Sequence, residues 1–489
     1  MKNLSLFFLT ILLFASACKT SKNTTFNLKA PVTELPEVDI IESRTNLYRA
    51  SATKVNDLIH VDLKVKFDYE KQQLNGIAEL TLQPHFFATK ELVLDAKNFI
   101  FHKVVLLENG DEENLLYTYD TAQIKIDLGK EFPAGKPYKI LINYTAKPNE
   151  KRIGGSEAIK SDKGLFFINP LGKEKNKPTQ IWTQGETESN SGWFPCIDKP
   201  NQKMTDQIEM TVDTQYVTLS NGLLVSSSNN NDGTRTDTWK MDLPHAPYLV
   251  MMAIGKYAIV KDKWRDKEVN YYVEPEFADV AKDIFGNTPE MMETFSKELG
   301  VDYAWQKYAQ ITARDYVSGA MENTSATLHG DFLQRTKRQL IDEKREDIIA
   351  HELFHQWFGD LVTCESWSNI PLNESFATYG EYLWNEHKYG NFYADWKQYA
   401  QAQAYFRESQ FKNVDLIRYY YRNREDMFDR HSYSKGGAIL KMLRAYVGDS
   451  AFFKSLNLYL KTNQFKSVEV HNLRLAFEEV TGRDMNTFF

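Results

Sequence analysis

The segment His351–His355 carries two histidines and a glutamate at a spacing that can build a metal site. His351 and His355 are four residues apart, so on an α-helix their side chains project from the same face. Two imidazoles in this arrangement can bind one zinc ion. Glu352, between them, would lie beside the open coordination position, where it can act as a general base. These residues predict zinc-assisted chemistry on a water molecule.

A third ligand is available farther along the chain. Glu374 lies nineteen residues after His355, within a second segment of helical character. Two histidines and one carboxylate, with water in the fourth position, form a catalytic zinc site, whereas a structural site is closed by four protein ligands. The alternative is an exposed helix that carries these residues by chance. The flanking segments Asp347–Ala350 and Gln356–Phe358 are largely apolar and favour a buried helix, in which unpaired His and Glu would be costly. We therefore expect one zinc ion per chain.

The segment Gly319–Asn323, upstream of the zinc helix, has the character of a peptide-binding strand. Gly319 and Ala320 have little bulk, so their backbone could approach an extended peptide and hydrogen-bond to it. Glu322 would then offer a carboxylate to a free α-amino group. Taken alone, the segment could equally be a loop with a solvated glutamate, and only its place beside the zinc motif favours a function.

Two other positions could assist. Glu186 lies in a second acidic loop and could join Glu322 around an ammonium group, because two neighbouring carboxylates need a positive guest to offset their repulsion. On its own, this loop could be a surface turn. Tyr433 opens a late helical segment and could donate a hydrogen bond to a developing oxyanion. With 26 tyrosines in the chain, Tyr433 alone would be interpreted as structural.

Composition limits the alternatives. The chain has 489 residues, of which 42% are apolar, enough for two or three packed domains. A net charge of −7 without a basic block argues against nucleic-acid binding. Three cysteines exclude a disulfide framework. Cys196 and Cys364 could pair, but we expect two small buried thiols.

The first residues predict an export signal. Lys2 precedes the apolar stretch Leu4–Phe14, which is too short to span a bilayer, and small residues then lead to Cys18. Residues 1–18 resemble a bacterial lipoprotein signal, in which the cysteine is lipidated and anchors the protein to the membrane. The alternative is ordinary cleavage after Ala17. Residues 19–46 are polar and indicate a flexible tether. We expect an exported lipoprotein of the bacterial envelope, in the periplasm or at the cell surface.

The elements that must position these residues fall into two regions. Residues 47–255 alternate between apolar and polar side chains, as in Val61–Tyr69, and predict an antiparallel, β-rich, sandwich-like N-terminal domain. Tyr248–Ala253 is expected to be an apolar strand. Residues 256–489 predict an α+β domain. Its expected helices are Asp279–Leu299, Glu343–Phe358, Glu374–Lys388 and Gly436–Val447.

Together the motifs resemble the M1 family of zinc aminopeptidases, which includes aminopeptidase N and leukotriene A4 hydrolase. The matching pieces occur in the family's order and extend from about residue 50 to the end of the chain. They are Gln184–Glu186, Trp193–Asp198, Gly319–Asn323, His351–His355, Glu374 and Tyr433–Gly436.

The resemblance implies a β-rich N-terminal domain on a thermolysin-like catalytic domain, and a role for each matching residue. The implied zinc ligands are His351, His355 and Glu374, with Glu352 as general base and Tyr433 at the oxyanion. The implied substrate-binding residues are Gln184, Glu186, Gly319, Ala320, Met321 and Glu322, with Gln184 lining the first side-chain pocket. The chain departs from the family in having Ser375 where glycine is common, from which we expect only local repacking. It is also expected to stop before the family's C-terminal domain, either as a fragment or as an unusually short member.

The expected activity is removal of the N-terminal residue from peptides by a zinc-bound water, with Glu352 as the base. An internal peptide segment has no ammonium group and would leave the carboxylates of Glu186 and Glu322 unpaired, so an exopeptidase is expected. Two alternatives remain: a catalytically inactive lipoprotein that binds peptides, and an epoxide hydrolase of the leukotriene A4 hydrolase type.

Overall fold

The computed structural model describes residues 47–150, 154–156 and 158–489. The expected signal peptide, Cys18 and the expected tether lie outside these residues. The chain separates into Met1–Arg44 and Thr45–Phe489 by internal contacts, and only the second unit is described below. Among the described residues, the helices are all too short or too polar to cross a membrane.

An eight-stranded sheet dominates the first half of the unit, in the order β13-β14-β11-β1-β2-β8-β4-β5. Its strands are β1 (Asn56–Asp68), β2 (Gln73–Pro84), β4 (Phe99–Glu108), β5 (Asp111–Asn114), β8 (Tyr138–Ala146), β11 (Met204–Asp213), β13 (Leu223–Asn229) and β14 (Thr234–His245). The alternation in β1 buries Leu58, Val61, Leu63 and Val65 on one face. The sheet is antiparallel except at β1 and β11, which run parallel because a long excursion of chain separates them.

A three-stranded sheet covers this apolar face. It consists of β3 (Thr89–Asp95), β6 (Leu116–Tyr119) and β7 (Gln123–Phe132) in the order β3-β7-β6. Leu94 and Ile126 from this sheet share one hydrophobic cluster with Leu80 and Ile140 of the larger sheet. The two sheets therefore form the sandwich that the alternation predicts.

A four-stranded sheet follows, in the order β12-β15-β10-β9, and leads toward the second half. Its strands are β9 (Leu165–Ile168), β10 (Gln180–Thr183), β12 (Val217–Ser220) and β15 (Met252–Gly255). The expected strand Tyr248–Ala253 is wrong over its first residues, because Pro247–Leu249 forms a 3-10 helix and β15 begins at Met252. The fixed backbone angle of Pro247 suits the first position of a helix. Cys196 and Cys364 are free and buried, as expected.

The second half is built on a mixed five-stranded sheet in the order β16-β17-β18-β20-β19. Its strands are β16 (Ala258–Trp264), β17 (Lys267–Val273), β18 (Tyr308–Ala313), β19 (Ala320–Met321) and β20 (Ala326–Gly330). A short parallel pair, β21 (Val362–Cys364) and β22 (Lys466–Val468), lies apart from it. The fold class is therefore the predicted one: a β-rich half followed by an α+β half.

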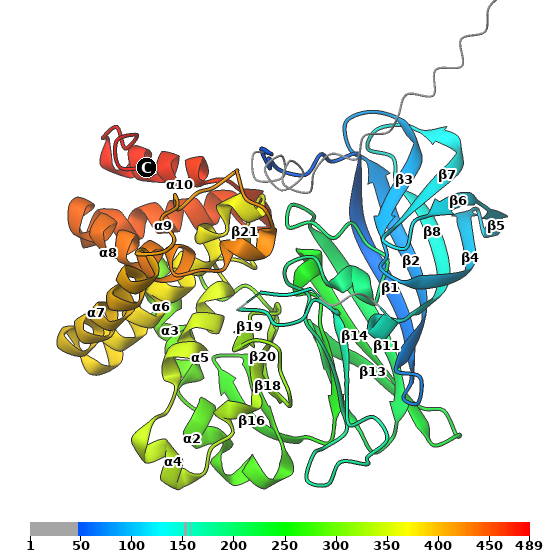
Figure 1. The fold of residues 1–489 in the computed structure, drawn as a ribbon, viewed down its shortest axis with the longest axis horizontal. Helices are drawn as coiled ribbons and strands as arrows, with labels where there is room; N and C mark the ends of the chain where they lie inside the picture. The colour runs from blue at the N-terminus through cyan, green and yellow to red at the C-terminus, as the bar shows by residue number, and fades with distance from the viewer. Residues whose placement is uncertain (1–46, 151–153, 157) are drawn as a thin grey trace, which may run out of the picture. The chain divides into compact units, whose positions relative to one another are not determined.

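Helices make up most of the remaining chain, and Figure 1 shows α5 to α10 gathered together, away from the long strands of the sandwich. They are α2 (Ala281–Phe285), α3 (Thr288–Leu299), α4 (Lys337–Asp342), α5 (Glu346–His355), α6 (Pro371–Tyr389), α7 (Asn391–Glu408), α8 (Gly436–Val447), α9 (Asp449–Asn463) and α10 (Val470–Thr481). The expected helix Asp279–Leu299 is in fact broken at Gly286, and α3 restarts with a proline in its first turn. The expected helix Glu343–Phe358 is shorter at both ends.

Hydrogen bonds tie the two halves together next to the predicted site. The side chain of Asn373 donates to the hydroxyl of Tyr248 at 3.2 Å, and the side chain of Asn323 donates to the carbonyl of Leu249 at 3.3 Å. Thr187 donates to Glu425 at 2.6 Å. The loop that follows β10 is thereby fixed against the helical region, so residues from both halves can contribute to one site.

Candidate active site

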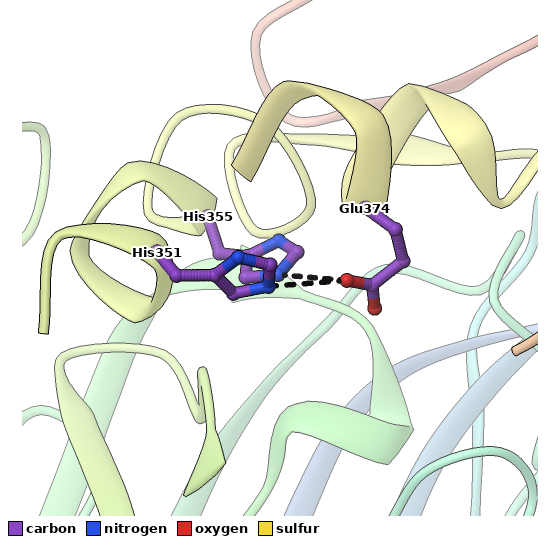
Figure 2. Close-up of side chains that lie close together, drawn as sticks. All are labelled: His351, His355 and Glu374. Atoms are coloured by element: carbon purple, nitrogen blue, oxygen red, sulfur yellow. Dashed lines mark hydrogen bonds and ion pairs between the residues drawn. The ribbon is translucent and has the colours of Figure 1, made fainter. Parts of the chain in front are cut away.

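Helix α5 places the two histidines of the zinc motif opposite Glu374 on α6, with both rings directed at its carboxylate. The ring centroids of His351 and His355 are 4.9 Å apart. Their Nε2 atoms lie 3.3 and 3.4 Å from the same oxygen, Oε2 of Glu374. Figure 2 shows both rings pointing from one helix toward this carboxylate. The three residues can thus offer two nitrogens and one oxygen to a single ion.

The outer nitrogens of both rings are already occupied. Nδ1 of His355 lies 3.0 Å from the carbonyl oxygen of Phe358, and Nδ1 of His351 lies 2.8 Å from Oε1 of Glu381. A carbonyl oxygen only accepts, so Nδ1 of His355 must donate, and the Nδ1 of His351 donates equally well to its carboxylate. In the neutral rings, both Nε2 lone pairs then face Glu374. Lone pairs directed at a carboxylate repel it unless a cation lies between them, so this arrangement fits a zinc ion.

Glu381 was not anticipated from the sequence. It lies seven residues after Glu374 in α6, two helical turns along the same face, so the periodicity of the helix could have indicated it. Gly359 also bears on the geometry of the site. Its φ is +139°, and a Cβ there would lie 3.1 Å from Nδ1 of His355, close to the hydrogen bond with Phe358. A glycine leaves that bond undisturbed.

The charges around the cluster favour a cation. Burial alone would lower the pKa of His355, but the carboxylates of Glu322 and Glu374 raise it to about 9. Burial raises the pKa of Glu352, and the same two carboxylates add to the effect while the histidines oppose it. Excess negative charge in a buried site must be neutralised by protons or by a metal ion. Glu352 lies next to His355, within the reach of one ion, and lines the cavity.

The cavity in front of this cluster has a volume of about 1360 Å³ and contains two unpaired carboxylates. Glu186 and Glu322 are almost completely buried, and in the described part of the chain Oε1 of each has no hydrogen-bond partner. With Glu374, they place oxygens within 4.8 Å of one another. Burial, then the neighbouring carboxylates, raise the pKa of Glu186, and burial raises that of Glu322 despite the histidines. A positively charged group of a ligand would satisfy both residues.

The strand β19 holds Glu322 at the cavity. Ala320 pairs with His329 of β20, and the carbonyl of Glu322 accepts a hydrogen bond of 2.8 Å from Gln356 on the turn after α5. Because β19 is the last strand of its sheet, its other edge is open, and Gly319 and Ala320 line the cavity. An open strand edge can pair with an extended peptide.

Gln184 and Met321, which the resemblance implies as substrate-binding residues, contact each other next to the site. Both are buried, and neither is among the described residues that line the cavity. The side chain of Gln184 donates to the sulfur of Met321 at 3.2 Å and accepts a hydrogen bond from the hydroxyl of Tyr316. Tyr316 is thus a neighbour of these residues that the motifs did not indicate.

Tyr433 lies on a short π-helical turn, η8 (His431–Lys435), immediately before α8. Its ring stacks on that of His351, with centroids 5.9 Å apart and planes inclined by 10°. Burial raises the pKa of Tyr433, and Glu374 and Glu186 raise it further, so the hydroxyl remains a hydrogen-bond donor. The structure therefore gathers His351, Glu352, His355, Glu374 and Tyr433 around one space.

Comparisons with known proteins agree with this arrangement. The model of the peptidase M1 N-terminal domain matches residues 57–249, and the model of the peptidase family M1 domain matches residues 284–489. Aminopeptidase N of Streptomyces lividans is 28% identical over 465 residues, which cover 91% of this chain and 51% of the relative. Tricorn protease-interacting factor F2 of Thermoplasma acidophilum is 30% identical over 323 residues, covering 62% of this chain and 39% of the relative. The chain thus spans about half or less of these curated relatives.

Solved structures show the same fold. The M1 zinc metallopeptidase of Deinococcus radiodurans has a TM-score of 0.74 at 21% identity, covering 90% of this chain and 94% of that one. A mutant of the same enzyme was solved with a Tyr-Ser-Ala substrate, with a TM-score of 0.71. Both domain models of one family match in the expected order, and the donor set is that of a zinc site, so the chain belongs to the zinc peptidase family M1.

Proposed function

We propose that the protein is a zinc aminopeptidase that removes the N-terminal residue from peptides. The observation that carries this proposal is the pair of buried, unpaired carboxylates, Glu186 and Glu322, beside the three metal-binding side chains. They form an anionic end to the cavity at the place where the ammonium group of a peptide would bind. The relatives that share the family include aminopeptidases, which supports the same reaction.

The three side chains that would hold zinc are those of His351, His355 and Glu374. When bound, zinc supplies a Lewis acid that polarises the scissile carbonyl and lowers the pKa of water to about 7. Glu352 then takes the proton of the attacking water and passes it to the departing amine nitrogen. Its raised pKa suits a group that must both accept and release a proton near neutral pH.

Other residues position the peptide. The open edge of β19, at Gly319 and Ala320, would pair with the peptide backbone, and Glu186 and Glu322 would bind its ammonium group. The hydroxyl of Tyr433 would donate to the oxyanion that forms at the scissile carbonyl, a contribution of about 3 kcal/mol for one donor in comparable sites.

The preference for a free amino terminus follows from the same carboxylates. An internal segment of a chain would bury both without a cation, at a cost of about 3–5 kcal/mol for a broken buried pair. The Deinococcus enzyme with its bound Tyr-Ser-Ala supports a short peptide as the substrate class. Neither the peptide-capturing lipoprotein nor the epoxide hydrolase has a feature of this site in its favour over the aminopeptidase.

We also propose that the protein is exported and anchored to the bacterial envelope by a lipid on Cys18. The sequence pattern of residues 1–18 is the support for this proposal. Metabolic labelling with a fatty-acid analogue should label the wild-type protein and not Cys18→Ser. Equal labelling of both would overturn the anchor, without bearing on the peptidase.

Three substrates test the enzymatic proposal: a fluorogenic aminoacyl amide, a tripeptide and the same tripeptide with an acetylated amino terminus. Wild-type protein should cleave the first two and leave the acetylated peptide intact, and a chelator should abolish cleavage until zinc is restored. Cleavage of the acetylated peptide at an equal rate would favour an endopeptidase. Zinc-loaded protein that binds the tripeptide without cleaving it would favour the peptide-capturing alternative.

A further inference from the structure

A chain of hydrogen bonds connects a metal-binding histidine with the turn that carries Tyr433. Glu381 accepts from Nδ1 of His351 through Oε1, at 2.8 Å. Its other oxygen, Oε2, accepts from the amide nitrogen of Gln401 on α7, at 3.1 Å. The amide oxygen of Gln401 in turn accepts from the hydroxyl of Ser434, at 2.9 Å. Gln401 therefore joins the environment of the metal site to the residue after Tyr433.

Chemistry fixes the orientation of the Gln401 amide. The ionised carboxylate of Glu381 accepts a hydrogen bond from His351 and can only accept at its second oxygen, so the group facing that oxygen must be a donor, which is the amide nitrogen. The amide oxygen is then left for Ser434, whose hydroxyl must donate. A single rigid group that donates on one side and accepts on the other is needed here. Asparagine has the same group but is one methylene shorter, so glutamine fits this position.

His351, at one end of this series of hydrogen bonds, also contacts Tyr433, which directly precedes Ser434 at the other end. The ring of Tyr433 stacks on that of His351, so the stacking and the hydrogen bonds together form a closed loop of contacts. Ser434 is completely buried, and Glu381 and Gln401 are partly buried, so water competes weakly for these bonds. Within the described residues, the hydroxyl of Tyr433 has no hydrogen-bond partner, so its position depends on the turn.

Helix α7 holds the other side of the turn as well. Glu408, at the last position of α7, lies 2.8 Å from Nδ1 of the fully buried His431 and accepts from the backbone of Arg430 at 3.2 Å. The turn is thereby fixed by α7 before and after Tyr433. Gln401 is the residue of α7 whose contacts reach both the turn and the metal site.

We propose that Gln401 is a positioning residue that couples the orientation of His351 to that of Tyr433. The proposal rests on the proposed function, in which these two residues hold the metal and stabilise the oxyanion. Gln401 is not among the described residues that line the cavity, so its influence passes through Glu381 and Ser434. Outer contacts of this kind orient metal ligands and affect both metal affinity and activity.

Two measurements on Gln401→Leu test separately its effect on the metal ligand His351 and its effect on Tyr433. Competition with a chromogenic chelator should show zinc affinity reduced on the order of tenfold, the lower end of the range for lost outer contacts. With an aminoacyl amide, kcat should fall by a similar factor at nearly constant KM, because Tyr433 acts on the transition state. Gln403→Leu is the matched control, because Gln403 is partly buried on the same helix and forms no side-chain hydrogen bond within the described residues. It should retain wild-type values in both measurements.

A double substitution separates coupling from general damage. In a Tyr433→Phe background, Gln401→Leu should no longer reduce kcat, because the group it positions is gone. An undiminished loss in that background, or wild-type zinc affinity and kcat in Gln401→Leu, would overturn the proposal. Should Gln401→Leu fail to fold, Ser434→Ala must show the same loss of kcat, and its wild-type kcat would count against the proposal. If the wild-type enzyme cleaves no peptide, the proposed function fails, while the chelator measurement still decides the His351 end.

Discussion

The side chain of Ser375 donates a hydrogen bond of 2.6 Å to the backbone carbonyl of Ser432. The bond joins helix α6, one residue after the metal-binding Glu374, to the turn that carries Tyr433. Ser375 stands where family members commonly have glycine, and the sequence suggested only a small local change. The structure shows instead a direct connection between the two parts of the site. Gly436 makes room for it, since a Cβ at that position would lie 1.7 Å from the Ser375 hydroxyl.

Ser375→Ala should lower the free energy of unfolding by about 1 kcal/mol, because it removes one buried hydrogen bond and leaves the carbonyl of Ser432 without this donor. Urea denaturation measures this change, with Ser450→Ala as the control. Ser450 lies exposed on α9, so its removal should change stability by less than about 0.5 kcal/mol. Equal values for the two variants would show that the Ser375 bond contributes no stability.

Glu352→Gln should abolish turnover while leaving zinc bound. The amide keeps the shape of the carboxylate but cannot accept the proton of water, so kcat should fall by about 10²–10⁴. Elemental analysis after dialysis should still find one zinc per chain, because Glu352 is not one of the three ligands. The control Glu298→Gln removes an exposed carboxylate from α3 and should keep wild-type kcat. Retained turnover in Glu352→Gln would remove this residue from the role of base.

Zinc affinity should depend on contacts outside the ligand set. Glu381→Gln weakens the acceptor that orients His351, and Gly359→Ala places a methyl group beside Nδ1 of His355. Each should reduce zinc affinity by about 10–100-fold in competition with a chelator, at unchanged content of helix by circular dichroism. Affinities equal to that of the wild type would mean that the ligand geometry does not depend on these outer contacts.

The zinc-binding set could be predicted from the sequence because helical spacing alone places His351 and His355 on one face. The contacts that orient it could not, because Gln401 and Ser434 are separated in sequence by 33 residues and meet only through tertiary packing. The same limit explains why the contact between Gln184 and Tyr316, 132 positions apart in the sequence, was not anticipated. Local sequence patterns indicate which residue types are present, whereas long-range packing decides which atoms they contact.

His329 should make the stability of the protein depend on pH. It is completely buried on β20, opposite Ala320 of β19, and burial lowers its pKa from 6.5 to about 3. The unfolded chain binds a proton at this residue below pH 6.5 while the folded protein does not. The stabilising contribution is therefore present above pH 6.5 and is lost progressively toward pH 3.

Because of His329, the free energy of unfolding should fall by about 2 kcal/mol as the pH is lowered from 7 to 5. The raised pKa values of buried carboxylates give slopes of the opposite sign, so the His329 contribution is read from the difference between the wild type and His329→Gln. Urea denaturation at each pH supplies both curves, and His471→Gln, an exposed position on α10, should parallel the wild type. Parallel curves for His329→Gln as well would show that His329 does not titrate differently in the two states.

Glu322→Gln tests the basis of the preference for free amino termini. The amide is nearly isosteric and keeps the hydrogen bond from Gln356, which is made to the backbone carbonyl, but it removes the negative charge that faces the ammonium group. A charge-assisted hydrogen bond of this kind contributes about 1.5–3 kcal/mol, so kcat/KM for a free tripeptide should fall about 10–100-fold. The acetylated tripeptide has no ammonium group to lose. Its low rate should therefore stay the same or rise, and the ratio of the two rates should shrink. If both substrates slowed by the same factor, Glu322 would support the fold of the site rather than recognise the amino terminus.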